Sequence, residues 1–285
     1  MYAVYHGPDG LRYIADQIHY KANALSTALK TLGYDVVEDP GFDTVKIRLH
    51  ETEKANLERV LKNQGINLNY FSEGIVSISI DETSTLPKIQ KLVDALAGYL
   101  GKQSYKIEIK EEYSIPAELL RTDDILTNEV FNKYHTETEL MRYIKRLERK
   151  DLSLVHSMIS LGSCTMKLNA ATEMLPLSWS EWGNVHPFIP VDQAKGYQEM
   201  IKALEEDLAE ITGFAKTSLQ PNSGAQGEYA GLMVIREYHK SRGEHHRNIV
   251  LIPQSAHGTN PASAVMAGMK VVVVKNLESG QIDFE

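Results

Sequence analysis

Apolar residues recur every three or four positions over residues 9–32, which is the spacing of one face of an α-helix. The run stops at Gly33, and glycine there is typical of a helix C-terminus. Ser72-Glu73-Gly74 separates two short apolar runs and is typical of a hairpin turn. The order of elements favours a small antiparallel or mixed sheet covered by helices on one face. Besides the first helix, periodicity predicts helices over 52–63 and 86–100 and strands over 42–49, 67–71 and 75–80.

Hydrophobic periodicity is lost over residues 102–135, where Pro, Ser and mixed charges are typical of a solvated linker. Thr136 and Glu139 then have the spacing of a capping box, which predicts a helix to about residue 150. The remainder alternates helical and strand-like runs, as expected for an α/β fold. The predicted helices are 170–175, 196–212 and 229–240, and the predicted strands are 249–252 and 271–274.

These patterns divide the chain into three parts. We expect a small α/β domain over 1–101, a linker and helix over 102–150, and a second α/β domain over 151–285. The second domain is expected to be incomplete, because a strand-like run over 271–274 is followed by only a short polar segment.

The chain has 285 residues, a formal charge of −8 and 42% hydrophobic residues, as in ordinary globular proteins. The acidic balance argues against nucleic acid as a partner, and no apolar run approaches the ~20 residues of a membrane span. The single cysteine, Cys164, rules out an internal disulfide and favours an intracellular location. Residues 1–20 resemble neither a secretory nor a transit peptide. His6, His19 and His50 are isolated and are expected at the surface or at helix ends; no metal site is expected.

A small-residue stretch, Ser223-Gly224-Ala225-Gln226, opens the predicted helix that continues to residue 240. Two interpretations remain open. Ser223 and Gln226 have the spacing of a capping box, while exposed backbone N–H groups at a helix start also suit a phosphate. His257 follows the next predicted strand, and ligands of open α/β sheets bind at the carboxyl ends of strands.

Phosphate-binding groups near an imidazole suit an aromatic cofactor with a phosphate tail. Histidine can place its ring against a pyridine ring, and Ser255, Thr259 and Asn260 would surround that ring with hydrogen-bonding groups. This combination suggests pyridoxal phosphate, which stabilises carbanions. Thiol catalysis by Cys164 with His156 or His186 has no support in the spacing of these residues.

Four long strings resemble the glycine cleavage system P-protein family, glycine dehydrogenase (decarboxylating). They are GSCTMKLNAATEMLPLSW (162–179), WGNVHPF (182–188), QPNSGAQGEYAGL (220–232) and HGTNPASAVMAGM (257–269). Residues 1 to about 120 resemble the end of the family's first half, and the following residues resemble the start of its second half. The resemblance implies a fold-type-I pyridoxal-phosphate transferase-like fold, with a small C-terminal-type α/β domain and an incomplete large domain.

The resemblance also implies a reaction: glycine is decarboxylated and its aminomethyl group passes to the lipoyl arm of the H-protein. Within the implied site, one group of residues holds the cofactor and another lines the substrate end. The cofactor group is Ser223, Gly224, Ala225, Gln226, His257 and Thr259, and the substrate group is Ser163, Cys164, Thr165, His186 and Asn260.

The family's Schiff-base lysine and the acidic partner of the pyridine nitrogen are implied to lie beyond residue 285. We therefore expect an internal fragment that is inactive alone and that associates with the other half or subunit of a P-protein. The implied location is the cytoplasm for a bacterial protein and the mitochondrion for a eukaryotic one. Two alternatives stay open: another fold-type-I enzyme, such as an amino-acid decarboxylase or cysteine desulfurase, and a non-catalytic interaction subunit.

Overall fold

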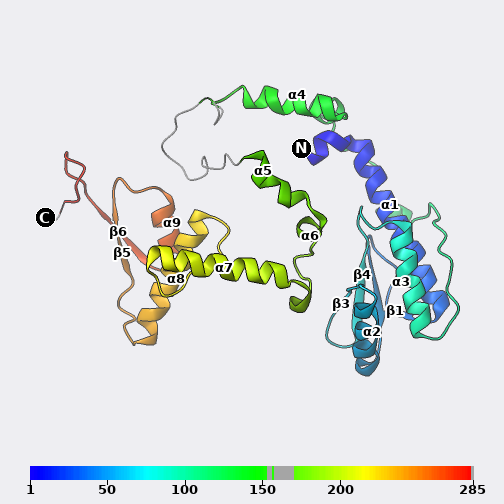
Figure 1. Cartoon of the computed structure of the whole chain (residues 1–285). Helices are drawn as coiled ribbons and strands as arrows, with labels where there is room; N and C mark the ends of the chain where they lie inside the picture. The colour runs from blue at the N-terminus through cyan, green and yellow to red at the C-terminus, as the bar shows by residue number, and fades with distance from the viewer. Residues whose placement is uncertain (153–155, 157–169, 284–285) are drawn as a thin grey trace. The chain divides into compact units, whose positions relative to one another are not determined.

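The computed structural model describes residues 1–152, 156 and 170–283. These form a mixed α/β chain that divides into two compact units, Met1–Met158 and Ile159–Glu285 (Figure 1). We call them unit 1 and unit 2 and describe each by itself. The three-part division at residues 101 and 150 stays a prediction. None of the described helices is both long and apolar enough to cross a membrane.

Unit 1 contains a four-stranded antiparallel sheet in the order β1-β2-β4-β3. Val45 and Ile47 of β2 lie opposite Ile78 and Val76 of β4, so all four side chains share one face. These residues are buried in one core with apolar residues of α1, α2 and α3. The bounds are α1 Tyr2–Leu32, β1 Asp35–Val36, β2 Thr44–Arg48, α2 Glu51–Asn63, β3 Asn69–Tyr70, β4 Ile75–Ser79 and α3 Leu86–Tyr99.

The helices and strands predicted for the first hundred residues are present, with two differences. A short strand, β1, was not predicted, because two residues are too few to show a period. The first helix starts at Tyr2 rather than residue 9 and is interrupted at Gly7, whose φ of 65° and ψ of −176° are not helical. That conformation is accessible to glycine, and Pro8 then restarts the helix as its first residue.

The predicted hairpin turn between β3 and β4 is confirmed, and it requires glycine. Glu73 and Gly74 both have positive φ, 62° and 72°, as in a type I′ turn. The Gly74 carbonyl accepts the Leu49 N–H at 2.8 Å, and a side chain at Gly74 would collide with the Leu49 backbone. The turn therefore both reverses the chain and packs against the end of β2.

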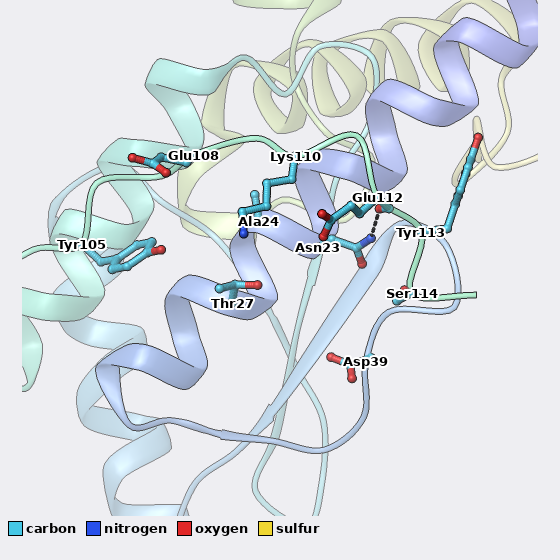
Figure 2. A pocket seen from close by; sticks show the side chains of 10 residues that line it. All are labelled: Asn23, Ala24, Thr27, Asp39, Tyr105, Glu108, Lys110, Glu112, Tyr113 and Ser114. Carbon is cyan, nitrogen blue, oxygen red and sulfur yellow. Dashed lines mark hydrogen bonds between the residues drawn. The ribbon is translucent and has the colours of Figure 1, made fainter. Parts of the chain in front are cut away.

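The segment after α3 lies along α1, although residues 102–116 form neither helix nor strand. Tyr113 donates its hydroxyl to Asp16 at 2.6 Å, and the Asn23 amide donates to the Glu112 carbonyl at 2.8 Å. The Asp16 carboxylate raises the pKa of Tyr113 by accepting that hydrogen bond. Figure 2 shows this segment passing over α1.

The described remainder of unit 1 contains η1 Ala117–Leu119, η2 Glu129–Asn132 and α4 Glu137–Glu148, the last with the predicted Thr136 capping box.

His19 holds this arrangement together, and the expectation that it lies at the surface or a helix end was wrong. Only 1% of the residue is exposed. Its Nδ1 lies 2.9 Å from the Phe42 carbonyl oxygen and its Nε2 lies 3.1 Å from the Ser114 amide nitrogen. A carbonyl only accepts and a backbone N–H only donates, so the ring is neutral with its proton on Nδ1. The single imidazole thus joins α1 to two distant segments.

Unit 2 contains two parallel strands with a helix between them. β5 Ile249–Pro253 pairs with β6 Lys270–Val274 in register, and α9 Thr259–Met266 connects them. This is a βαβ unit, as the alternation of helical and strand-like runs predicted. The described helices that precede it are α5 Ala171–Met174, η4 Leu175–Ser178, α6 Ser180–Gly183, η5 Val191–Gln193, α7 Lys195–Thr212 and α8 Gly224–Ser241.

Replacing His19 with Leu is expected to destabilise unit 1. Leucine fills the space but leaves the Phe42 carbonyl and the Ser114 N–H without their partners, at about 1–3 kcal/mol for each buried group. Urea unfolding monitored by circular dichroism measures the loss. The control is Asn56→Leu at an exposed position of α2, which should leave the unfolding free energy within about 0.5 kcal/mol of wild type. Equal stability of the two variants would contradict the role of His19.

Candidate functional site

The start of α8 is an exposed helix N-terminus built from small residues. Ser223 is the N-cap, and its hydroxyl accepts the Gln226 N–H at 3.3 Å. The Gln226 side chain reaches back to the Asn222 N–H at 2.9 Å instead of the N-cap N–H, so the predicted capping box forms only in part. Within the described residues, no acceptor is recorded for the N–H groups of Gly224 or Ala225. A side chain built at Gly224 would meet nothing within 4 Å, so this turn is open to a ligand.

The loop after β5 places His257 at the carboxyl end of that strand. The Asn276 side chain accepts the Ser255 N–H at 3.2 Å, and the Gln254 N–H donates to the Val274 carbonyl at 2.8 Å, which together fix the loop to the end of β6. The first turn of α9 follows directly, beginning at Thr259. The loop is therefore positioned by both strands of the sheet.

The His257 ring is oriented by its own loop. Its Nδ1 lies 3.2 Å from the Thr259 amide nitrogen and 2.9 Å from the Thr259 hydroxyl. Because the backbone N–H can only donate, Nδ1 accepts and the neutral ring carries its proton on Nε2. The ring is exposed, which leaves a face available for an aromatic ligand.

Two hydrogen bonds hold α8 and α9 side by side. Asn260, in the first turn of α9, donates its amide to the Glu228 carboxylate at 2.8 Å. At the other end of α9, the Arg236 guanidinium donates to the Ala267 carbonyl. The two helices therefore run in the same direction, and their N-terminal turns lie at the same end. Both helix dipoles place their positive ends there, which favours an anion.

The structure thus brings together two groups of the residues that the sequence predicted. Asn260 of the His257–Asn260 loop bonds to Glu228, which lies two residues after the Ser223–Gln226 turn, so the loop and the turn lie at the same end of α8 and α9. The contacts of His186 with other described residues are local: its ring lies near the Phe188 ring and accepts the Phe188 N–H at 3.0 Å, and its carbonyl accepts the Ile189 N–H at 3.0 Å. Ser163, Cys164 and Thr165 lie outside the described residues.

Glu228 and Arg236 were not predicted from the sequence as residues of the site. Each joins a residue about thirty positions away, and no local pattern reveals such a partner. The one unusual feature in the sequence is that Glu228 lies in the second turn of a helix whose first turn suits an anion. Its carboxylate would repel a bound anion unless another group formed a hydrogen bond with it.

A second polar concavity lies within unit 1, between α1 and the 105–114 segment. It is a cavity of about 340 Å³ lined by charges of both signs, including Asp39, Glu108 and Lys110 (Figure 2). Asp39 is engaged by Lys30, which lowers the pKa of its carboxyl. The cavity has neither a helix N-terminus nor a predicted site residue on its wall, so the candidate site is the one in unit 2.

Lys270 and Lys275 lie at opposite ends of β6. Lys270 pairs with Ile249 at the amino end of the sheet, whereas Lys275 follows Val274 at the carboxyl end that also carries the His257 loop. Both residues are exposed, so their amines are solvated.

Unit 2 is a βαβ unit with an open helix N-terminus and a polar loop at the carboxyl end of a strand, an arrangement typical of α/β proteins that bind ligands at this edge of the sheet. Residues 1–96 match the family model of the glycine cleavage system P-protein. The whole chain is 58% identical to glycine dehydrogenase (decarboxylating) of Christiangramia forsetii and 54% identical to that of Flavobacterium johnsoniae. It is also 52% identical to that of Shewanella loihica.

Each alignment covers all of this chain and 30% of the relative, so the chain spans less than a third of these curated proteins. The chain is thus similar over its whole length to part of glycine dehydrogenase (decarboxylating), and its first 96 residues match the P-protein family model.

The hydrogen bonds of His257 predict its tautomer. At pH 8, where histidine is mostly neutral, Nδ1 should resonate as an unprotonated nitrogen and Nε2 as a protonated one. Long-range ¹H–¹⁵N correlation spectra of ¹⁵N-labelled protein measure this directly. The exposed His245 is the internal control and should show the tautomer mixture of free imidazole. A proton on Nδ1 of His257 would contradict the described loop.

Proposed function

We propose that this chain contributes the cofactor-binding part of a glycine dehydrogenase (decarboxylating). The observation that carries the proposal is the bond from Asn260 in the His257 loop to Glu228 near the N-terminus of α8, where that loop follows a strand of a parallel sheet. The similarity to glycine dehydrogenases along the whole chain supports glycine as the substrate. The mixed α/β architecture supports a fold-type-I large domain, of which unit 2 would be the first part, with unit 1 as a small domain.

The residues of this edge fit pyridoxal phosphate. The N–H groups of Gly224 and Ala225 and the Ser223 hydroxyl would bind the phosphate, because they lie at the positive end of α8 and are exposed. Gln226 already donates its N–H to Ser223 and would stabilise the turn rather than reach the ligand through that group. Pyridoxal phosphate, when bound, supplies an electron sink for the electron pair released on decarboxylation.

His257 and Thr259 would hold the aromatic part of the cofactor. Thr259 fixes the ring of His257 through Nδ1, so the imidazole can stack without losing side-chain entropy on binding. The amide nitrogen of Asn260 is occupied by Glu228, so Asn260 would offer its carbonyl oxygen to the amino group of glycine. Ser163, Cys164, Thr165 and His186 complete the proposed substrate wall.

The proposed partners follow from the same family. The aminomethyl group would pass to the lipoyl arm of the H-protein, and the other half or subunit of the P-protein would complete the enzyme. The bacterial origin of the relatives supports the cytoplasm as the proposed location.

Placing a carboxylate at Ala225 should weaken cofactor binding without harming the fold. Ala225→Glu puts an acidic residue in the first turn of α8, where it interacts favourably with the helix dipole but repels a phosphate. Ala225→Gln has nearly the same shape without the charge and is the matched control. In full-length protein that carries this sequence, Ala225→Glu should weaken pyridoxal phosphate binding roughly tenfold or more, and Ala225→Gln much less. Fluorescence titration measures both affinities. Equal affinities of the Ala225→Glu and Ala225→Gln variants would contradict a phosphate site at this turn.

We also propose that no single lysine of the 285-residue chain alone forms a specific covalent adduct with pyridoxal phosphate. The exposed lysines at the ends of β6 have solvated amines, whereas a cofactor-binding lysine needs a desolvated amine aimed at the cofactor. Incubation with the cofactor, borohydride reduction and peptide mapping tests this. Modification concentrated on Lys275, which shares the sheet edge with His257, would show that the anchor lies within this chain; scattered trace labelling of exposed lysines would not.

A further inference from the structure

The His257 loop has a contact with α8 that does not involve His257 itself. His257 bonds to Thr259 within its own loop. Asn260 donates two hydrogen bonds. Its backbone N–H donates to the His257 carbonyl at 3.1 Å, and its side-chain amide donates to the Glu228 carboxylate at 2.8 Å. A continuous chain of hydrogen bonds therefore runs from the second turn of α8 to the backbone of His257.

Glu228 is well placed to act on the site without touching a ligand. It is half-buried, lies two residues after Gln226, and directs its carboxylate toward α9. An unpaired carboxylate this close to the first turn would weaken anion binding. The Asn260 amide donates a hydrogen bond to the Glu228 carboxylate. This bond keeps the carboxylate directed toward α9 and also fixes the His257 loop to α8.

We propose that Glu228 is a positioning residue that sets the distance between His257 and the anion-binding turn, acting through Asn260. This inference rests on the proposed function. It assigns Glu228 a role distinct from that of Arg236, which joins the opposite ends of the same two helices. Loss of Glu228 would leave the βαβ unit intact and free the His257 loop to move relative to α8.

A comparison of Gln and Ala at position 228 separates positioning from simple charge. Gln retains an acceptor oxygen for Asn260 and removes the negative charge, while Ala removes both. Charge alone predicts that Glu228→Gln and Glu228→Ala bind an anion equally well and better than wild type. Positioning predicts that Glu228→Gln retains the wild-type affinity or exceeds it, while Glu228→Ala weakens binding about tenfold, the size expected for one hydrogen bond to a charged group.

Hydrogen–deuterium exchange of the 285-residue chain tests the link independently of any cofactor. Glu228→Ala and Asn260→Ala should each accelerate exchange of the amides of 257–262 about tenfold, with α7 unchanged, and Glu228→Gln should not. Asn260→Asp sets two carboxylates face to face and should accelerate exchange, and the swapped pair Glu228→Gln with Asn260→Asp should restore protection. Glu237→Ala is the control, because Glu237 bonds to Lys240 within α8.

Titration of full-length protein with pyridoxal phosphate then tests the consequence for binding. Weak binding by Glu228→Ala with retained binding by Glu228→Gln supports the inference. Wild-type exchange of 257–262 in Glu228→Ala overturns it, whatever that variant binds. A third outcome is that exchange changes as expected but wild-type protein binds no pyridoxal phosphate. That outcome contradicts the proposed function and any role of the Glu228–Asn260 bond in cofactor binding.

Discussion

The hydrogen bonds of Asn260 with Glu228 and of Arg236 with Ala267 impose the constraint on which the candidate site depends. Together they fix both the direction and the register of α9 relative to α8. With only one of these bonds the helices could rotate about it. With neither bond, these side chains would not keep the two N-terminal turns at the same end. The proposed site at the sheet edge thus depends on helix alignment, and two of the side chains that maintain the alignment, Glu228 and Arg236, touch no ligand in the proposed site.

In unit 1 a polar side chain on a helix likewise fixes distant parts of the chain. His19 is a buried imidazole whose two nitrogens satisfy a carbonyl on one segment and an amide on another. The 105–114 segment has no regular hydrogen-bonding ladder of its own, so side chains of α1 and of α3, where Gln90 bonds to Tyr105 and Ile107, supply its partners. In both units, a polar side chain on a helix determines where an irregular segment lies.

Local patterns predicted most of the fold because most of its elements are long enough to show a period. The stripe over 9–32, the alternation in β2 and the turn at Ser72-Glu73-Gly74 each carry their own signal. β1 is too short for one, and the burial of His19 depends on Phe42 and Ser114, which are distant in sequence. Contacts of this kind arise only when the chain has already folded.

The candidate site divides in the same way. The small residues of the α8 start and the histidine after β5 were visible in the sequence, since each belongs to one local motif. Their meeting was inferred from the general rule for α/β sheets, and the bond that joins them, between residues 228 and 260, could not be inferred. His186 shows the limit: the resemblance gave it a role, while its contacts with other described residues are local, with Phe188 and Ile189.

The β5–β6 sheet leaves much of its apolar surface uncovered: Leu251 is 67% exposed and Val273 62%. Few apolar residues of unit 2 are buried within the described part of the chain: Ile252, Ala264, Ala267 and Met269. The heat-capacity change and the denaturant dependence of unfolding both scale with the surface that folding buries. Unit 2 should therefore contribute little to the cooperativity of the chain, and a single sharp melting transition would report almost entirely on unit 1.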